Sequence, residues 1–230
     1  YYVKPQWFYE HTDFYDGYSR EVKVFSGEYA AHPVNGMNRG DANTLGGALA
    51  EAAFLTGVER NADVVALASY APLFARLGYA QWSPDMIWFD EEKVYCSPSY
   101  YVQKLYSENT GTVTMSMEGQ EKELAGEGIY VNVSLDEKKG EYILKAVNPA
   151  KEKKELQICG EDGEPVCGKA LAYILTGDAP WPQKEQAQGK ASGAGWPLPE
   201  KASIKTKEIV LEGSFVLEAE SFSVVRISVQ

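Results

Sequence analysis

The chain has 230 residues, of which 44% are hydrophobic and 12% aromatic, so it can bury one large core or two small ones. Its 33 acidic residues outnumber its 22 basic residues and give a net charge of −11, which disfavours nucleic acids and anionic membranes as partners because these bind clustered lysine and arginine. No apolar run approaches the ~20 residues that cross a bilayer, so we expect no membrane span and a neutral ligand such as a sugar.

Metal and disulfide chemistry is not indicated by the cysteine and histidine content. Three cysteines and two histidines are too few and too scattered for a zinc site or a disulfide framework. Cys159 and Cys167 flank the turn “GEDGEP” and could face each other across a hairpin, with free thiols as the alternative. We therefore expect no metal and no cofactor.

The chain begins with a predicted helix followed by a buried strand. In “PQWFYEHTDFYDGYSR”, residues 5–20, aromatic side chains recur at helical spacing, and Pro5 suits a first helical turn. The next run, “EVKVFSGEYA”, is continuous rather than alternating, as in a strand that is covered on both faces. Its apolar part ends at Gly27, Glu28 and Tyr29. For Glu28, a helix cap or the partner of an arginine is the alternative to a catalytic role.

Helices and buried strands then continue to alternate. “DANTLGGALAEAAFLTG” predicts a helix from a cap at Asn43 or Thr44 to a stop at Gly57. “ADVVALASYAPLF”, residues 62–74, predicts a second buried strand, and after a long loop “SPSYYVQKLYS”, residues 97–107, predicts a third helix. This order predicts a parallel sheet, open or closed into a (β/α) barrel, with the two strands adjacent and the middle helix packed across them.

The pattern changes at about Thr110 to alternating runs separated by charged or glycine-rich turns. Residues 178–200 are too rich in glycine and proline for regular structure and predict a long loop. Seven runs predict an antiparallel β-sandwich: “TVTMSME”, “GIYVNVSLD”, “EYILKAVN”, “ELQICG”, “VCGKALAYILTG”, “KEIVLEG” and “SFSVVRISVQ”.

Several motifs of the chain resemble the second half of the family 51 glycoside hydrolases, the α-L-arabinofuranosidases, especially the branch found in plants and gut bacteria. They are “KVFSGEYAAH”, “NTLGGALAEAAFLTGVERNADVVALASYAPLF”, “WSPDMIWFD” and “SPSYYVQKLYS”. The resemblance runs from Tyr1 to about Ser107 and more loosely to the closing “SFSVVRI”. It implies the C-terminal part of a (β/α)8 TIM barrel over residues 1–108, followed by a β-sandwich over residues 109–230.

The resemblance also implies a retaining glycosidase, in which a nucleophilic carboxylate and an acid/base carboxylate lie ~5 Å apart. The family's nucleophile is the glutamate of “GEYA”, which corresponds to Glu28, and barrel active sites lie at strand C-termini. A family tyrosine beside the nucleophile touches the sugar. Tyr2 is our choice for this role, with Tyr1 or a plain core tyrosine as alternatives, and we interpret His32 as a loop histidine.

The family's acid/base is a glutamate that follows an asparagine on an earlier strand, and no Asn–Glu pair occurs in this sequence. One hypothesis is that this chain is the C-terminal part of an enzyme that hydrolyses terminal non-reducing α-L-arabinofuranosides of polysaccharides. On this hypothesis the chain alone is inactive. It would form a homo-oligomer or associate with the missing N-terminal portion, and in a polysaccharide-degrading bacterium it would be periplasmic or secreted. The other hypothesis is a non-catalytic remnant whose sandwich binds carbohydrate or is structural. Activity of the chain alone would require another acid, Asp41 or Asp85.

Overall fold

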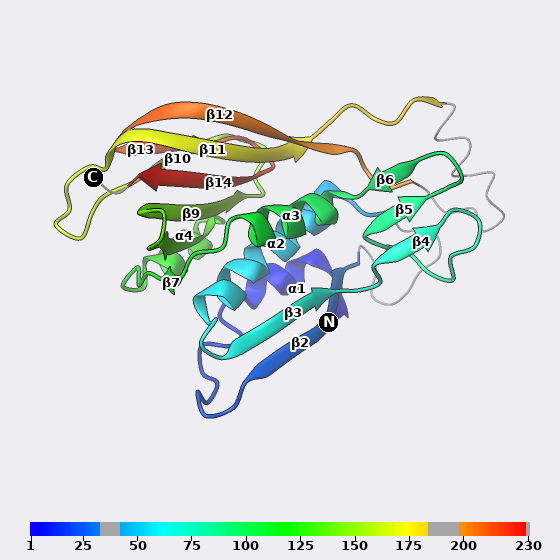
Figure 1. The fold of residues 1–230 in the computed structure, drawn as a ribbon, viewed down its shortest axis with the longest axis horizontal. Helices are drawn as coiled ribbons and strands as arrows, with labels where there is room; N and C mark the ends of the chain where they lie inside the picture. The colour runs from blue at the N-terminus through cyan, green and yellow to red at the C-terminus, as the bar shows by residue number, and fades with distance from the viewer. Residues whose placement is uncertain (33–41, 184–197, 229–230) are drawn as a thin grey trace.

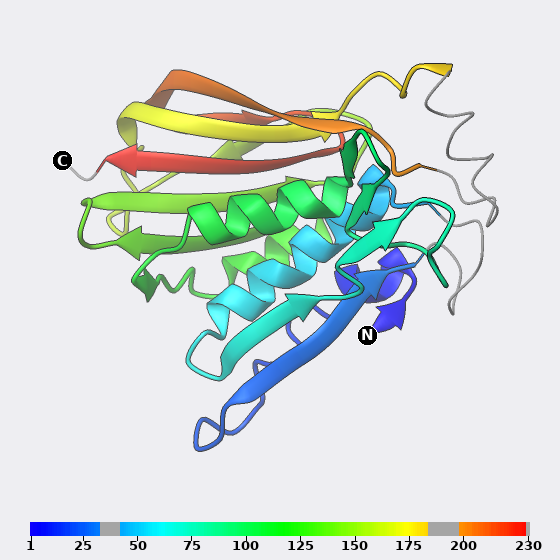
Figure 2. The same cartoon turned by 45° about the vertical axis from the view of Figure 1, so that its right-hand side comes forward.

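Two sheets enclose a layer of helices in the computed structural model, which describes residues 1–32, 42–183 and 198–228 (Figure 1). The parallel strands lie on one side of the helices α2 and α3, and the large antiparallel sheet lies on the other. The turned view in Figure 2 shows the same order of layers. No helix in these described ranges is long and apolar enough to cross a bilayer.

The first sheet is parallel, in the order β1–β2–β3. The two buried runs that we expected to be adjacent and parallel are β2 and β3. A two-residue strand, too short to show a pattern in the sequence, joins them on the other edge of β2. The bounds are β1 Tyr2–Val3, β2 Val24–Ala31 and β3 Val65–Tyr70.

Four helices occur in the described residues: α1 Pro5–Glu10, α2 Leu45–Arg60, α3 Pro98–Glu108 and α4 Gln120–Gly126. The helix α1 is shorter than predicted because residues 11–17 form turns instead. The helix α2 begins after Thr44, whose hydroxyl accepts a hydrogen bond from the amide of Gly47 at 3.0 Å. It continues past Gly57, so the predicted stop was wrong.

Gly57 is explained by close packing of α2 against the turn that follows α1. A Cβ atom at this position would lie 1.7 Å from the carbonyl oxygen of Thr12, a distance at which the backbone must move. Only a hydrogen fits between the two segments, so glycine serves packing here and not helix termination.

We expect Gly57→Ala to lower the free energy of unfolding by about 3 kcal/mol, because overpacking of this kind forces backbone shifts. Gly46→Ala is the matched control on the same helix, since a Cβ there meets nothing within 4 Å, and it should stabilise by up to about 1 kcal/mol. Urea denaturation followed by circular dichroism measures both changes. Equal stability of the two variants would contradict the close approach at Thr12.

A small third sheet occupies the segment that we predicted to be a long loop. It consists of β4 Phe74–Arg76, β5 Ile87–Phe89 and β6 Val94–Cys96, with β4 parallel to β5 and β5 antiparallel to β6. Runs of three residues carry no readable period, which is why the sequence analysis missed them. Figure 1 shows this sheet beyond the C-terminal end of β3.

The large sheet is antiparallel, in the order β12–β11–β14–β9–β8–β7. The strands β10 and β13 pair separately with each other. All seven predicted runs contain a strand, and the short β13 was missed. The bounds are β7 Val113–Thr114, β8 Tyr130–Asp136, β9 Glu141–Asn148, β10 Lys154–Gln157, β11 Cys167–Gly177, β12 Ala202–Glu212, β13 Ser214–Leu217 and β14 Ser221–Ser228.

The two faces of the large sheet are covered differently. One face packs on α2 and α3, and its side chains share a single core with the parallel strands. The other face packs on β10 and β13, so within the described residues the second strand layer is much smaller than the first. Cys159, in the connection between β10 and β11, and Cys167, the first residue of β11, are exposed free thiols. Residues 184–197 of the predicted loop lie outside the described residues.

A buried ion pair fixes the large sheet to the helix layer. Lys145 of β9 is fully buried, bonds to Glu59 of α2, and places its ammonium 4.9 Å from the ring centre of Tyr106 in α3. Asn132 of β8 donates to the other oxygen of Glu59 at 2.8 Å. These contacts join residues on both sides of position 108 into one packed unit.

Candidate active site

Glu28 lies near the C-terminal end of β2, with an exposed side chain. The strand β1 pairs with β2 so that Tyr2 is opposite Ala30, and the phenol of Tyr2 donates a hydrogen bond to Oε2 of Glu28 at 2.8 Å. The structure therefore brings together the two residues that the sequence analysis singled out. The predicted alternative of a helix cap does not apply, because α2 is capped by Thr44.

Tyr1 points away from this pair. Its ring stacks on Trp7 with centroids 5.0 Å apart, and its hydroxyl lies 3.5 Å from that of Tyr15. The side chain of Tyr1 thus packs with Trp7 of α1 and Tyr15, and Tyr2 is the tyrosine beside Glu28.

The phenol of Tyr2 keeps its proton over the whole physiological range. Burial, the hydrogen bond to Glu28 and the charges of Glu28 and Asp85 together raise the pKa of Tyr2 to about 12. The phenol can therefore donate its hydrogen bond to Glu28 at every pH in this range. This bond orients a solvent-accessible carboxylate at the strand end.

His32 follows directly after β2 and is 2% exposed. Its amide donates to the carbonyl of Val3 at 2.8 Å, and its ring lies edge-on to the ring of Tyr2 with centroids 5.5 Å apart. As expected, His32 lies outside the regular elements, in the segment that follows β2. Its burial against Tyr2 was not foreseen from the sequence.

Asp85 is a buried carboxyl group that the sequence analysis named only as a fallback acid. It is 2% exposed, and its Oδ2 atom has no hydrogen-bond partner among the described residues. Burial raises the pKa of Asp85 to about 7, and its charge acts on Tyr2 and on Tyr70 at the end of β3. The other fallback, Asp41, lies outside the described residues.

Glu51 of α2 is a second buried carboxyl group with a raised pKa. It is 1% exposed, and burial raises its pKa to about 7. Because the native state holds these two protons more tightly than the unfolded chain, the free energy of unfolding should fall as pH rises from about 4 to about 7. The fall should be on the order of 3 kcal/mol for each carboxyl. Asp16 and Asp136 have lowered pKa values, so their effect on the free energy of unfolding occurs below this pH range.

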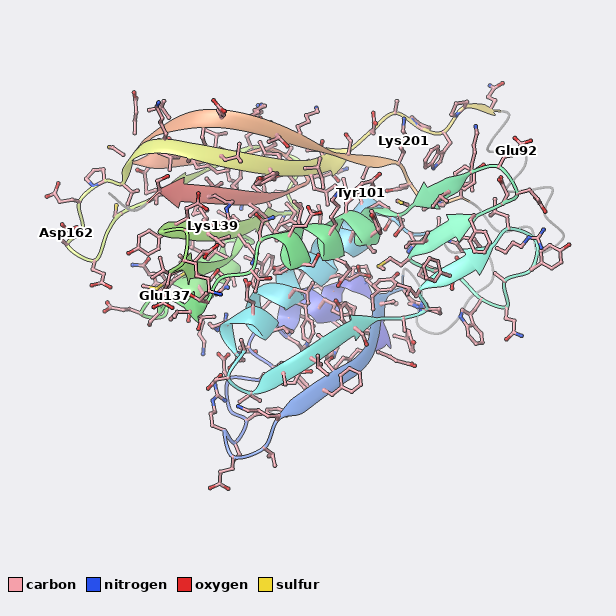
Figure 3. All side chains as sticks on the ribbon, viewed as in Figure 1. Glu92, Tyr101, Glu137, Lys139, Asp162 and Lys201 are labelled. Atoms are coloured by element: carbon pink, nitrogen blue, oxygen red, sulfur yellow. The ribbon has the colours of Figure 1, made fainter. Side chains whose placement is uncertain are left out.

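Urea denaturation at pH values between 4.5 and 7.5 measures this effect. Glu51→Gln and Asp85→Asn should each flatten the profile, whereas Asp162→Asn should leave it unchanged. Asp162 is exposed in the turn between β10 and β11, at the far end of the antiparallel sheet (Figure 3). A Glu51 or Asp85 variant with the wild-type slope would contradict the assignment.

The arrangement suits attack by a carboxylate on an electrophilic carbon, with Tyr2 holding the attacking group in place. No cluster of three or more histidine, cysteine, aspartate or glutamate side chains that could hold a metal ion occurs within the described residues.

Known proteins match the chain over this region and beyond it. The profile of the α-L-arabinofuranosidase C-terminal domain family matches residues 27–208. An extracellular exo-α-L-arabinofuranosidase of Streptomyces chartreusis is 49% identical over 112 residues, covering 48% of this chain and 12% of that protein. α-L-Arabinofuranosidase 1 of Arabidopsis thaliana is 38% identical over 139 residues, covering 59% of this chain and 19% of that protein.

Solved structures agree with the sequence matches. A GH51 α-L-arabinofuranosidase with bound arabinose aligns with 100% of this chain and 36% of its own, with a TM-score of 0.78 and 27% identity. The arabinose complex of the Thermotoga maritima enzyme, at 17% identity and a TM-score of 0.63 over 90% of this chain and 43% of that one, supports the fold alone. The chain thus spans less than half the length of each of these relatives. Since the family profile covers more than half of it, the chain belongs to the α-L-arabinofuranosidase C-terminal domain family and corresponds to the C-terminal part of the family 51 glycoside hydrolase fold.

Proposed function

We propose that this chain is the C-terminal part of a retaining α-L-arabinofuranosidase that releases terminal non-reducing arabinofuranosyl groups from arabinose-containing polysaccharides. Residues 1–108 would supply the last strands of a (β/α)8 barrel, and residues 109–230 its β-sandwich domain. The single observation that carries the proposal is Glu28 at the C-terminal end of a parallel strand, oriented by the phenol of Tyr2. The arabinose complex of the GH51 enzyme that is 27% identical to this chain supports the substrate class.

In this mechanism Glu28 is the nucleophile. Its carboxylate attacks the anomeric carbon while an acid protonates the departing glycosidic oxygen, which gives a covalent glycosyl ester. Water, deprotonated by the same acid/base group, then displaces Glu28 and restores the original configuration. Tyr2 takes no proton in either step, because its phenol remains protonated, and it holds the carboxylate oxygen that is not attacking while its ring borders the sugar.

The acid/base is proposed to lie on a polypeptide segment that corresponds to the part of the relatives this chain does not span. Among the described residues the Glu28 side chain accepts a hydrogen bond from the phenol of Tyr2, which keeps its proton, and cleavage of an unactivated glycoside requires a separate proton donor. The chain alone is therefore proposed to be inactive and to function together with that segment.

The test starts from the gene sequence upstream of Tyr1. An open frame that encodes an Asn–Glu pair at a strand end, with hydrolysis of an aryl α-L-arabinofuranoside by the longer protein, would support the enzyme. A stop codon or an unrelated domain at that position would overturn it and favour the non-catalytic module. That second outcome predicts polysaccharide binding by the 230-residue chain, measured by affinity gel electrophoresis on arabinan and arabinoxylan.

A further inference from the structure

The end of β2 is held differently on its two sides. Toward β1, the amides of Ala30 and His32 donate to strand carbonyls at 3.0 and 2.8 Å. Toward β3, the ladder closes with the amide of Ala71 donating to Tyr29 at 3.2 Å, because β3 ends at residue 70. The next donor on that side, the amide of Ala31, therefore needs an acceptor from outside the sheet.

Glu51 of α2 supplies this acceptor. Its Oε1 atom accepts the amide hydrogen of Ala31 at 2.8 Å, in a bond that is buried from solvent. The carboxyl group thus takes the place of the carbonyl that a longer β3 would have offered. It also ties the helix that crosses the parallel strands to the strand end that carries Glu28.

The surroundings of Glu51 contain no compensating cation among the described residues. Tyr9 of α1, Tyr29 of β2 and Tyr70 of β3 are the titratable groups that sense its charge. The hydroxyl of Ser99 at the start of α3, like the Ala31 amide, favours the ionised form but does not outweigh burial. Among the described residues, the Oε2 atom of Glu51 has no hydrogen-bond partner.

A carboxyl group in this environment is costly to bury. An apolar residue would be buried here without this cost, and alanines occupy the neighbouring positions of the helix. The cost is explained if the acceptor at Ala31 has a role beyond packing.

We propose that Glu51 is a positioning residue, a carboxyl group on α2 that holds the end of β2 and thereby fixes Glu28 three residues upstream. The bond to Ala31 does not depend on any activity, and the importance of fixing Glu28 rests on the proposed function. Ionisation of Glu51 turns the Ala31 bond into a charge-assisted one, which is shorter and stronger. The strand end should therefore respond to pH at the midpoint of Glu51.

Selective labelling reads this bond directly in the 230-residue chain. The sequence contains two Ala–Ala pairs, Ala30–Ala31 and Ala52–Ala53, so alanine labelled with carbonyl ¹³C and amide ¹⁵N selects two amides. Ala53 lies within α2 and serves as the internal reference. The Ala31 amide proton should move downfield with a midpoint near pH 7, the value to which burial raises the pKa of Glu51.

The variant Glu51→Gln keeps the shape and an acceptor oxygen, and it should abolish this titration. Glu108→Gln, at the exposed end of α3, should leave the titration as in wild type. An Ala31 amide that does not titrate in wild type, or that titrates equally in Glu51→Gln, would overturn the bond on which the proposal depends.

A separate measurement tests whether Glu51 also affects Glu28. In wild type the side-chain carboxyl ¹³C resonance of Glu28 should show an inflection near pH 7 that follows the ionisation of Glu51, and Glu51→Gln should remove it. If Ala31 titrates while the Glu28 resonance shows no inflection at that pH, Glu51 holds the strand without positioning Glu28 and the proposal fails. Neither measurement uses catalysis, so loss of the proposed function in the assay above and loss of this inference are separate results.

Discussion

Replacing Glu28 by glutamine in the proposed full-length enzyme should lower kcat for an aryl α-L-arabinofuranoside by at least about 10³-fold, equivalent to ~4 kcal/mol of transition-state stabilisation. The amide is nearly isosteric and can still accept the hydrogen bond of Tyr2, so the fold should persist, but it cannot form the glycosyl ester. Steady-state rates measure the loss. Glu21→Gln, an exposed carboxylate before the start of β2, is the control and should retain wild-type rates.

Azide distinguishes loss of the nucleophile from general damage to the site. In Glu28→Ala a small anion can enter the space of the missing carboxylate and attack the anomeric carbon once, so activity should return with a glycosyl azide of inverted configuration. Product configuration is measured by NMR. A Glu28→Gln enzyme with more than about a tenth of the wild-type rate would show that Glu28 is structural. Rescue with retained configuration would contradict the nucleophile assignment in another way, because azide would then be displacing a different nucleophile and Glu28 would be the acid/base.

The elements that sequence reasoning predicted are those with a long and consistent pattern. The strands β2 and β3 appear as continuous apolar runs because both faces of a parallel sheet are normally covered, and Thr44 marks the start of α2 by its capping chemistry. Their adjacency and direction followed from the alternation of strands and helices. Glu28 and Tyr2 were found through a motif, since no periodicity distinguishes a catalytic carboxylate from a solvated one.

The missed elements are short or depend on distant partners. The strands β4, β5 and β6 have three residues each, which is too few to show a hydrophobic period. The helix α4 shows none because none of its seven residues is buried. The length of α2 was underestimated because Gly57 resembles a stop until the backbone of Thr12 is placed against it.

The two buried carboxyl groups illustrate the same limit in the site. Glu51 stands in the run “ALAEAAFL”, where it is the one charged residue in an otherwise apolar stretch of the helix. That interruption was a usable signal, because a helix that is apolar all round is buried and its glutamate must be buried with it. Asp85 gave no such signal, since “WSPD” resembles an ordinary turn until the end of β3 is placed beside it.

The chain alone is expected to associate, because its parallel sheet is incompletely covered. Phe25 and Leu67 are paired across β2 and β3 and are 64% and 62% exposed, and β3 is an edge strand with residues 66–68 exposed. Apolar surface and a free strand edge of this kind favour pairing with another chain. Light scattering of the purified 230-residue protein should therefore show a homo-oligomer, or a complex when the proposed N-terminal segment is supplied.

A lysine on the exposed face of β3 should weaken this association, because a charge there would be buried in the contact. Leu67→Lys should shift the protein toward monomer by at least tenfold in dissociation constant, whereas Val210→Lys, at a 69% exposed position on the edge strand β12 of the other sheet, should not. The oligomer should also fail to hydrolyse an arabinofuranoside with an unactivated leaving group, because two copies of Glu28 still supply no proton donor. A monomer that turns over such a substrate would contradict both expectations, and a monomer produced by Val210→Lys would place the contact on β12 instead of β3.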